Sequence, residues 1–217
     1  MKKPFSYLWP LTKTYDSQFS GKLEVTWING RKVLDSKNAN YSYGALHEVL
    51  DRGLANIHAD RATSVLLLGL GGGSAISLLR KKYGYYGKIT AVEIDQTIID
   101  ISRKEFGIEE HHPLELICAD AEAYVKSQSN KFGLIIVDIF LDLTVPEQFF
   151  SASFWQNIQR LLKPQGEVLF NAGINAAHEE QITSLLKNGN LGINFRKMEE
   201  VYGSNTLLLG EKEPEVL

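Results

Sequence analysis

The sequence predicts an α/β protein with a doubly wound, mostly parallel seven-stranded sheet that ends in an antiparallel hairpin. Short apolar runs rich in Val, Ile and Leu alternate with amphipathic stretches over most of the chain. This alternation is typical of parallel strands joined by crossover helices. The last two runs are separated only by Tyr202-Gly203-Ser204, which is too short for a parallel crossover. The sheet is therefore expected to close with a hairpin.

The N-terminal region is expected to be a small β-hairpin. Residues 21–35 alternate polar and apolar side chains around Asn29-Gly30, and this dipeptide favours the positive φ angles of a tight turn. A helical apolar spacing starts near residue 45. We therefore expect a hairpin region over 1–45 and the main domain over 46–217.

The main domain should contain five parallel strands with helices between them. The final hairpin adds two strands, over 193–201 and 205–210. The parallel strands are predicted over 64–70, 88–93, 114–118, 132–138 and 166–172, and the helices near 74–82, 96–106, 121–127, 150–162 and 177–187.

Composition favours small-molecule partners in a reducing compartment. Lys and Arg number 23 against 26 for Asp and Glu, so no basic footprint for nucleic acid or an anionic membrane is expected. We see no apolar segment long enough for a signal sequence or a membrane span. The single cysteine, Cys118, lies in an apolar run and is expected to be buried. The expected location is the cytoplasm.

A glycine-rich turn follows the first parallel strand. Gly69, Gly71 and Gly73 lie between this strand and the start of a helix. Glycines let the backbone approach a ligand closely, and the N–H groups at a helix start favour electron-rich atoms. The alternative is a tight turn that binds nothing.

Acidic residues follow the next three strands. Glu93 lies 24 positions after Gly69, where a carboxylate can accept hydrogen bonds from both ribose hydroxyls. Asp120 could accept a hydrogen bond from an adenine amino group or cap a helix, and Asp95 could likewise be an N-cap. Asp138 lies at the edge where doubly wound sheets bind ligands. Together these residues predict a site for an adenine nucleotide.

A nicotinamide cofactor fits the sequence less well. Gly69, Gly71 and Ser74 only approximate the dinucleotide-binding pattern, and no acid or base for hydride transfer is evident downstream. His111-His112 has no Cys or acidic partner at metal-binding spacing. No metal is expected.

The successive motifs GLGGGS, AVEID, the Asp120 segment, LIIVDIF and LLKPQGEVLF resemble those of the spermidine synthase-like branch of the class I S-adenosylmethionine-dependent methyltransferase superfamily. The resemblance covers residues from about 40 to 172. It implies a Rossmann-like fold, S-adenosylmethionine or its decarboxylated form as cofactor, and transfer of an aminopropyl or methyl group to an amine or other small nucleophile. It further implies that Asp138 acts on the attacking amine and that Tyr43 orients it. A non-catalytic nucleotide-binding homologue is the alternative.

The resemblance also implies a homodimer formed through the N-terminal hairpins. Apolar residues such as Val25 and Trp27 could serve that interface or cover the main domain instead.

Departures from the family pattern bear on the substrate. Gly72 stands where the family has an aspartate in the glycine loop. After the fourth strand this chain has Asp138-Ile-Phe-Leu-Asp142, whereas in the family the second acid lies closer to the first. Phe140 and Asp142 are then the candidates for contacting substrate. A diamine carries two positive charges and needs paired carboxylates when buried. These departures therefore argue against efficient putrescine chemistry.

Overall fold

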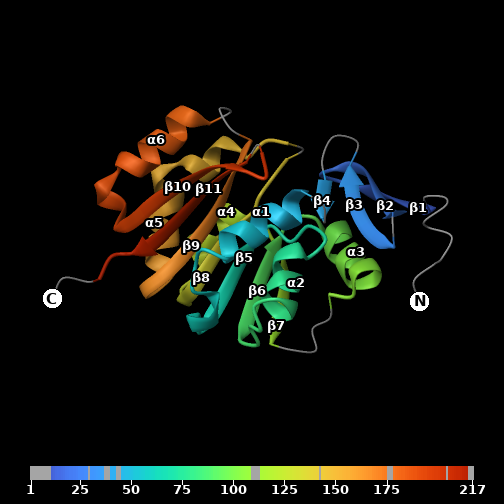
Figure 1. The fold of residues 1–217 in the computed structure, drawn as a ribbon, viewed down its shortest axis with the longest axis horizontal. Helices are drawn as coiled ribbons and strands as arrows, with labels where there is room; N and C mark the ends of the chain where they lie inside the picture. Colours follow the sequence, from blue (N-terminus) through green and yellow to red (C-terminus); the bar gives the residue numbers. More distant parts are fainter. Residues whose placement is uncertain are drawn as a thin grey trace.

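The computed structural model describes residues 11–28, 30–36, 40–42, 45–108, 113–141, 143–174, 178–203 and 205–214. It contains a seven-stranded sheet of order β10-β11-β9-β8-β5-β6-β7 and a four-stranded antiparallel sheet of order β1-β2-β3-β4 (Figure 1). The predicted α/β class and doubly wound main sheet are confirmed. None of the helices in the described ranges is both long and apolar enough to cross a membrane.

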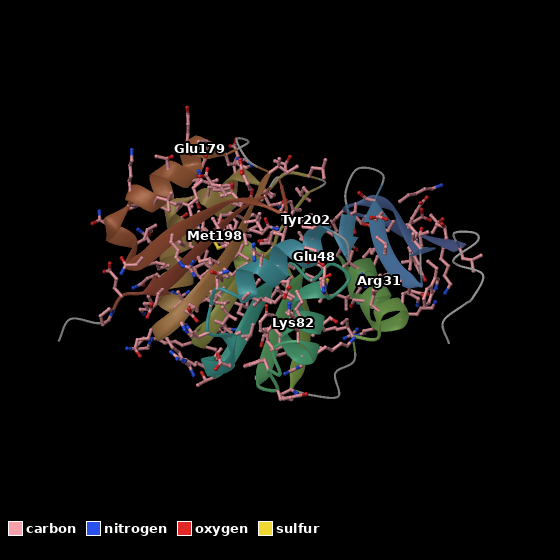
Figure 2. All side chains as sticks on the ribbon, viewed as in Figure 1. Arg31, Glu48, Lys82, Glu179, Met198 and Tyr202 are labelled. Carbon is pink, nitrogen blue, oxygen red and sulfur yellow. The ribbon has the colours of Figure 1, made fainter. Side chains whose placement is uncertain are left out.

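The large sheet has five parallel strands and ends in the predicted hairpin. β11 pairs antiparallel with both β9 and β10, and Tyr202 lies in the turn that joins β10 to β11 (Figure 2). The strands are β5 (Ser64–Leu68), β6 (Lys88–Glu93), β7 (Leu114–Cys118), β8 (Phe132–Val137), β9 (Leu162–Ile174), β10 (Ile193–Val201) and β11 (Asn205–Lys212).

Helices cover both faces of this sheet because successive side chains of each strand point to opposite faces. Val65 and Leu67 pack with one set of helices, whereas Leu66 and Leu68 pack with the other. The first set is α1 (Ala45–Leu54), α2 (Ser74–Lys81) and α3 (Gln96–Phe106); the second is α4 (Ala121–Ser127), α5 (Ala152–Leu161) and α6 (Glu179–Lys187).

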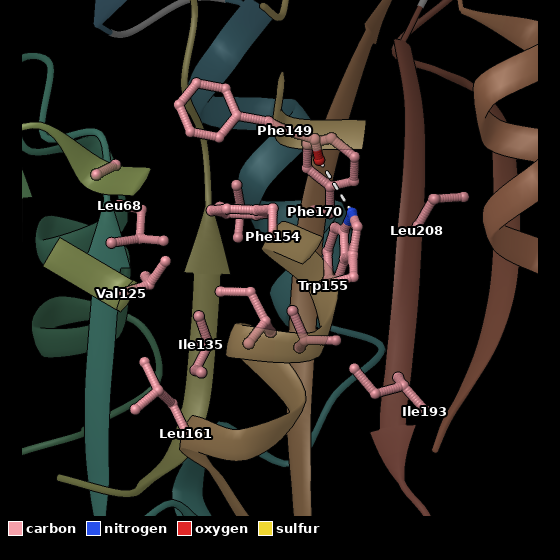
Figure 3. Packing of buried hydrophobic residues seen from close by; sticks show 14 of the residues in the cluster. Leu68, Val125, Ile135, Phe149, Phe154, Trp155, Leu161, Phe170, Ile193 and Leu208 are labelled. Carbon is pink, nitrogen blue, oxygen red and sulfur yellow. Dashed lines mark hydrogen bonds between the residues drawn. The ribbon is translucent and has the colours of Figure 1, made fainter. Parts of the chain in front are cut away.

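Aromatic side chains fill the core beneath α5. The Trp155 ring is fully buried and lies 5.2 Å from the Phe170 ring, measured between centroids. Its Nε1–H donates to the backbone oxygen of Phe149 at 2.9 Å (Figure 3). The indole thus fills the core while its one N–H donor is hydrogen-bonded. A buried tryptophan with an unpaired N–H would lower the stability of the fold.

Two expectations require correction. Cys118 is exposed, because β7 is the edge strand of the sheet. The N-terminal region is more than a hairpin: β2 (Gly21–Ile28) and β3 (Arg31–Ser36) pair as predicted, but β1 (Leu11–Ser17) and β4 (Asn40–Ser42) extend them to four strands. The side chains of β1 are mostly exposed, so this strand lacks the apolar alternation that reveals a half-buried strand.

The small sheet packs on α3. Val25 is buried with Leu23 and Leu34 against Ile98 and Ile101 of that helix. Val25 therefore packs on the main domain and is not exposed for contact with a second chain. The homodimer remains a prediction.

Glu105 fixes this contact electrostatically. Its carboxylate accepts hydrogen bonds from Lys13 Nζ at 2.6 Å, Lys32 Nζ at 2.7 Å and Tyr15 OH at 2.8 Å. Burial alone would raise the pKa of Glu105, but these three donors lower it to about 2. Strands β1 and β3 are thereby held to the end of α3.

Replacing Glu105 by Gln should lower the free energy of unfolding at pH 7 by about 2–3 kcal/mol, because the charge that both lysines face is lost. A carboxylate with a lowered pKa stabilises the fold above its unfolded-state pKa, and that contribution disappears as pH falls from about 4.5 towards 2. The deficit of Glu105→Gln in chemical denaturation should therefore shrink on acidification through this window. Asp100→Asn, at an exposed position of the same helix, should change stability by less than about 0.5 kcal/mol. Equal effects of the two substitutions would contradict this role.

Candidate active site

A cavity of about 310 Å³ lies at the carboxyl ends of the parallel strands. β5 sits between β8 and β6, so the connections leave it in opposite directions, which is where doubly wound sheets form ligand crevices. Six of the predicted site residues line the cavity. They are Gly69, Gly71, Glu93, Asp120, Asp138 and Phe140.

Gly69 allows two strand ends to approach each other. Its φ is +90°, and a Cβ added there would stand 2.1 Å from the carbonyl oxygen of Asp138. The Gly69 N–H donates to the Val92 oxygen at 2.9 Å, and the Asp138 N–H donates to the Leu68 oxygen at 2.8 Å. Only glycine combines this backbone conformation with this separation.

Glu93 is a buried carboxylate at the cavity wall. Its Oε2 accepts the N–H of Leu70 at 3.0 Å, and its Oε1 accepts the N–H of Asp95 at 3.1 Å. Burial raises its pKa, whereas these N–H groups and that of Gly71 lower it. A carboxylate can accept about four hydrogen bonds. Glu93 thus fixes the glycine turn and keeps acceptor capacity for hydroxyl groups of a ligand.

The two neighbouring acids cap helices while lining the same cavity. Asp95 accepts the Thr97 N–H at 2.8 Å, and Asp120 accepts the Ala123 N–H at 2.8 Å. The capping interpretation of both residues is confirmed. Asp95 also accepts a hydrogen bond from Ser17, so the small N-terminal sheet reaches the cavity wall.

Asp138 lies on the other side of Gly69 from Glu93, half-buried at the cavity surface. The surrounding protein shields the Asp138 carboxylate from water, and this desolvation raises its pKa to about 6. A hydrogen bond from Asn171 Nδ2, at 2.9 Å, lowers the pKa in part, and the Glu93 charge raises it further. At neutral pH the group is ionised, yet it binds a proton more readily than an ordinary aspartate.

Asn171 and Asn205 both line the cavity, and the sequence analysis identified neither. Asn171 on β9 is fully buried, and its Oδ1 accepts Asn205 Nδ2 at 3.1 Å and the Gly173 N–H at 3.3 Å. These contacts fix which end of the Asn171 amide faces Asp138. The sequence does contain a signal for Asn171, because it is the single polar side chain within the apolar run 168–172.

The remaining predicted residues do not join this group. Gly73 is absent from the cavity lining; its φ is +80°, and an added Cβ would meet Ile108 Cδ1 at 2.5 Å. Gly73 thus serves the packing at the start of α2. Tyr43 and Asp142 lie outside the described residues.

The hydrogen-bond acceptors of the cavity suit an adenosyl group. The carboxylates of Glu93, Asp95 and Asp120 follow β6 and β7, next to the apolar side chains of Val92 and Ile98. A nucleoside offers hydroxyl and amino donors to such carboxylates and a flat ring to such apolar groups. Gly69 itself lines the cavity beside these groups.

Comparison with known proteins gives a consistent result. The spermine/spermidine synthase domain model matches residues 46–202. A probable polyamine aminopropyl transferase of Bifidobacterium longum is 29% identical over 204 residues, which cover 84% of this chain and 44% of the relative. The chain spans about half the length of the curated relatives it matches.

Solved structures show the same fold. A probable spermidine synthase from Corynebacterium glutamicum superposes with a TM-score of 0.69 at 18% identity, covering 94% of this chain and 81% of that one. Human methyltransferase-like protein 13, in complex with SAH, gives a TM-score of 0.62 at 24% identity, covering 80% and 84%. The family and sequence matches do not favour the nicotinamide and non-catalytic alternatives.

Gly69→Ala should destabilise the protein by about 2–4 kcal/mol, because the new methyl group meets the Asp138 carbonyl and the backbone is strained. Gly84→Ala is the matched control: its φ is +62°, but nothing lies within 4 Å of an added Cβ. That variant should lose only about 1 kcal/mol. Thermal and chemical denaturation measure both. Similar losses would mean that the close approach at Gly69 has no special cost.

Proposed function

The chain belongs to the spermine/spermidine synthase family, and on this premise we propose that it transfers an aminopropyl group from decarboxylated S-adenosylmethionine to an amine. The observation that carries the proposal is the pair of acids on either side of Gly69: Glu93 on the nucleotide side and Asp138, with its raised pKa, on the acceptor side.

The donor would be held by the residues after β6 and β7. Glu93 accepts hydrogen bonds from the ribose hydroxyls, and Asp120 accepts one from the adenine amino group. Val92 and Ile98 contact the apolar faces of the nucleoside. When bound, the donor supplies a carbon activated by a positively charged sulfur.

Asp138 would act on the acceptor. As the amine nitrogen bonds to the activated carbon, the carbon–sulfur bond breaks, its electron pair stays on sulfur, and the nitrogen gives up a proton. Asp138 accepts that proton directly or through water and stabilises the positive charge developing on nitrogen. Asn171 holds the carboxylate in one orientation. Positioning of the two reactants supplies the rest of the acceleration.

Glu93→Gln tests the nucleotide site. The substitution keeps the shape but places an amide N–H group against a backbone donor, so binding of methylthioadenosine should weaken by about tenfold or more. Calorimetry with S-adenosylmethionine, its decarboxylated form, methylthioadenosine and NAD measures binding and identifies the preferred donor. Glu115→Gln, on the neighbouring strand and outside the cavity, should bind normally. Unchanged affinity in Glu93→Gln, or binding of NAD alone, would refute the proposed site.

Asp138→Asn tests the chemistry. Turnover, followed as methylthioadenosine release, should fall by about 10²- to 10⁴-fold while nucleotide binding persists. Since the pKa of Asp138 is about 6, wild-type kcat/KM should decline below pH 6 as the base becomes protonated. The variant should lack this acidic limb. An identical pH profile in both proteins would exclude Asp138 as the base.

A further inference from the structure

The turn between β1 and β2 reaches the cavity from the small N-terminal sheet, which lies beside α3 (Figure 1). Phe19 and Ser20 of this turn line the cavity. They lie with the residues that form its nucleotide half, namely Glu93, Ile94, Asp95, Ile98 and Asp120. The small sheet therefore supplies part of the wall of the site in addition to packing on α3.

One hydroxyl group closes this turn and ties it to the main domain. The Ser17 Oγ accepts the N–H of Phe19 at 3.1 Å and that of Ser20 at 2.7 Å, an arrangement by which serine side chains stabilise turns. The same hydroxyl donates a hydrogen bond to Asp95 Oδ2. Ser17 thus fixes the turn against the cavity wall.

The acceptor of that hydrogen bond is itself held firmly. Asp95 is only 2% exposed, and its Oδ1 accepts the Thr97 N–H at 2.8 Å. Its own N–H donates to Glu93 Oε1 at 3.1 Å. A chain of hydrogen bonds therefore runs from Glu93, the proposed acceptor for the ribose, through Asp95 to Ser17. The turn is positioned with respect to the group that would bind the nucleoside.

Phe19 has the exposure of a side chain that a ligand could cover. Its ring is 47% exposed, although it lines the cavity. Single exposed apolar residues are ordinary, but this one lies on a turn that a buried carboxylate holds in the wall of a cavity. Nucleobases stack favourably on aromatic side chains. The Phe19 ring therefore suits the outer face of a nucleoside.

We propose that Phe19 covers the nucleoside of the bound donor and that Ser17 and Asp95 are positioning residues for this contact. The inference rests on the proposed function, because it adds a wall to the nucleotide half of the same site. Phe19 contacts the nucleoside, whereas Ser17 affects binding through the turn that carries Phe19.

Calorimetric titration of the purified full chain with methylthioadenosine tests the contact. Phe19→Ala should weaken binding by about tenfold or more, the effect of losing one base–aromatic stack, whereas Phe19→Tyr should bind like the wild type. In turnover assays the loss should appear in KM for the donor, with kcat changed by less than about twofold, because the stack forms equally in the ground state and the transition state. Unchanged affinity in Phe19→Ala overturns the inference.

A double-mutant cycle tests the positioning role of Ser17. Ser17→Ala removes the donor to Asp95 and the acceptor that closes the turn, so it should weaken methylthioadenosine binding about as much as Phe19→Ala. Because both substitutions act through one contact, the double variant should lose little more than either single variant, whereas independent effects would multiply. Ser17→Thr keeps the hydroxyl and should bind like the wild type.

Thr12→Val is the matched control for this cycle. It removes the 2.9 Å hydrogen bond between the hydroxyls of Thr12 and Thr26, which joins β1 and β2 at another position of the same strand pair. Methylthioadenosine affinity should not change. If the losses from Ser17→Ala and Phe19→Ala multiply, or if Thr12→Val weakens binding as much as Ser17→Ala, Ser17 only stabilises the small sheet and its positioning role is wrong.

The inference and the proposed function fail separately. If methylthioadenosine binding depends on Phe19 but no amine is converted, aminopropyl transfer is wrong and the contact stands. If binding depends on Glu93 but not on Phe19, the contact is wrong and the nucleotide site stands. If methylthioadenosine does not bind the wild type, both are wrong.

Discussion

Gly69 ends β5, and the carbonyl oxygen of Asp138 occupies the space that a side chain at this position would need. This steric constraint lets the end of β8 approach the end of β5, while the N–H of Gly69 remains bonded to Val92 on β6. Three adjacent strands thus terminate together around one residue without a side chain. The two acids on either side of it, Glu93 and Asp138, are close enough for the charge of the first to raise the pKa of the second.

The main sheet and its acids could be predicted from the sequence because both signals are local. Apolar runs of strand length mark the buried strands, and the residue that follows each run must lie at the same edge of a parallel sheet. The misses depend on contacts between distant segments. β1 has mostly exposed side chains and is held by Glu105, about ninety residues away. Cys118 is exposed because β7 lies at the edge of the sheet. The order of strands in a sheet cannot be predicted from the spacing of apolar residues along the chain. The position of the Asn171 side chain depends on hydrogen bonds with Asp138 and with Asn205, which lies 34 residues later in the chain.

The fold does not choose the reaction. The same arrangement of strands occurs in human methyltransferase-like protein 13 and in a probable spermidine synthase, so shared architecture positions a nucleotide without dictating which group leaves it. The choice depends on a few side chains beyond the nucleotide. In this chain we propose that Asp138, which lines the cavity, is one of them.

The residues that orient the Asp138 carboxylate lie far beyond it in the sequence. Asn171 comes 33 residues after Asp138, and Asn205, which fixes the Asn171 amide, comes a further 34 residues later. During synthesis, the nucleotide half of the cavity has left the ribosome well before the strand that completes the other half. A prematurely terminated chain that lacks β11 therefore contains Asp138 and Asn171 but not Asn205, which holds the Asn171 amide. The arrangement of amides beside Asp138 is therefore complete only when β11 is in place.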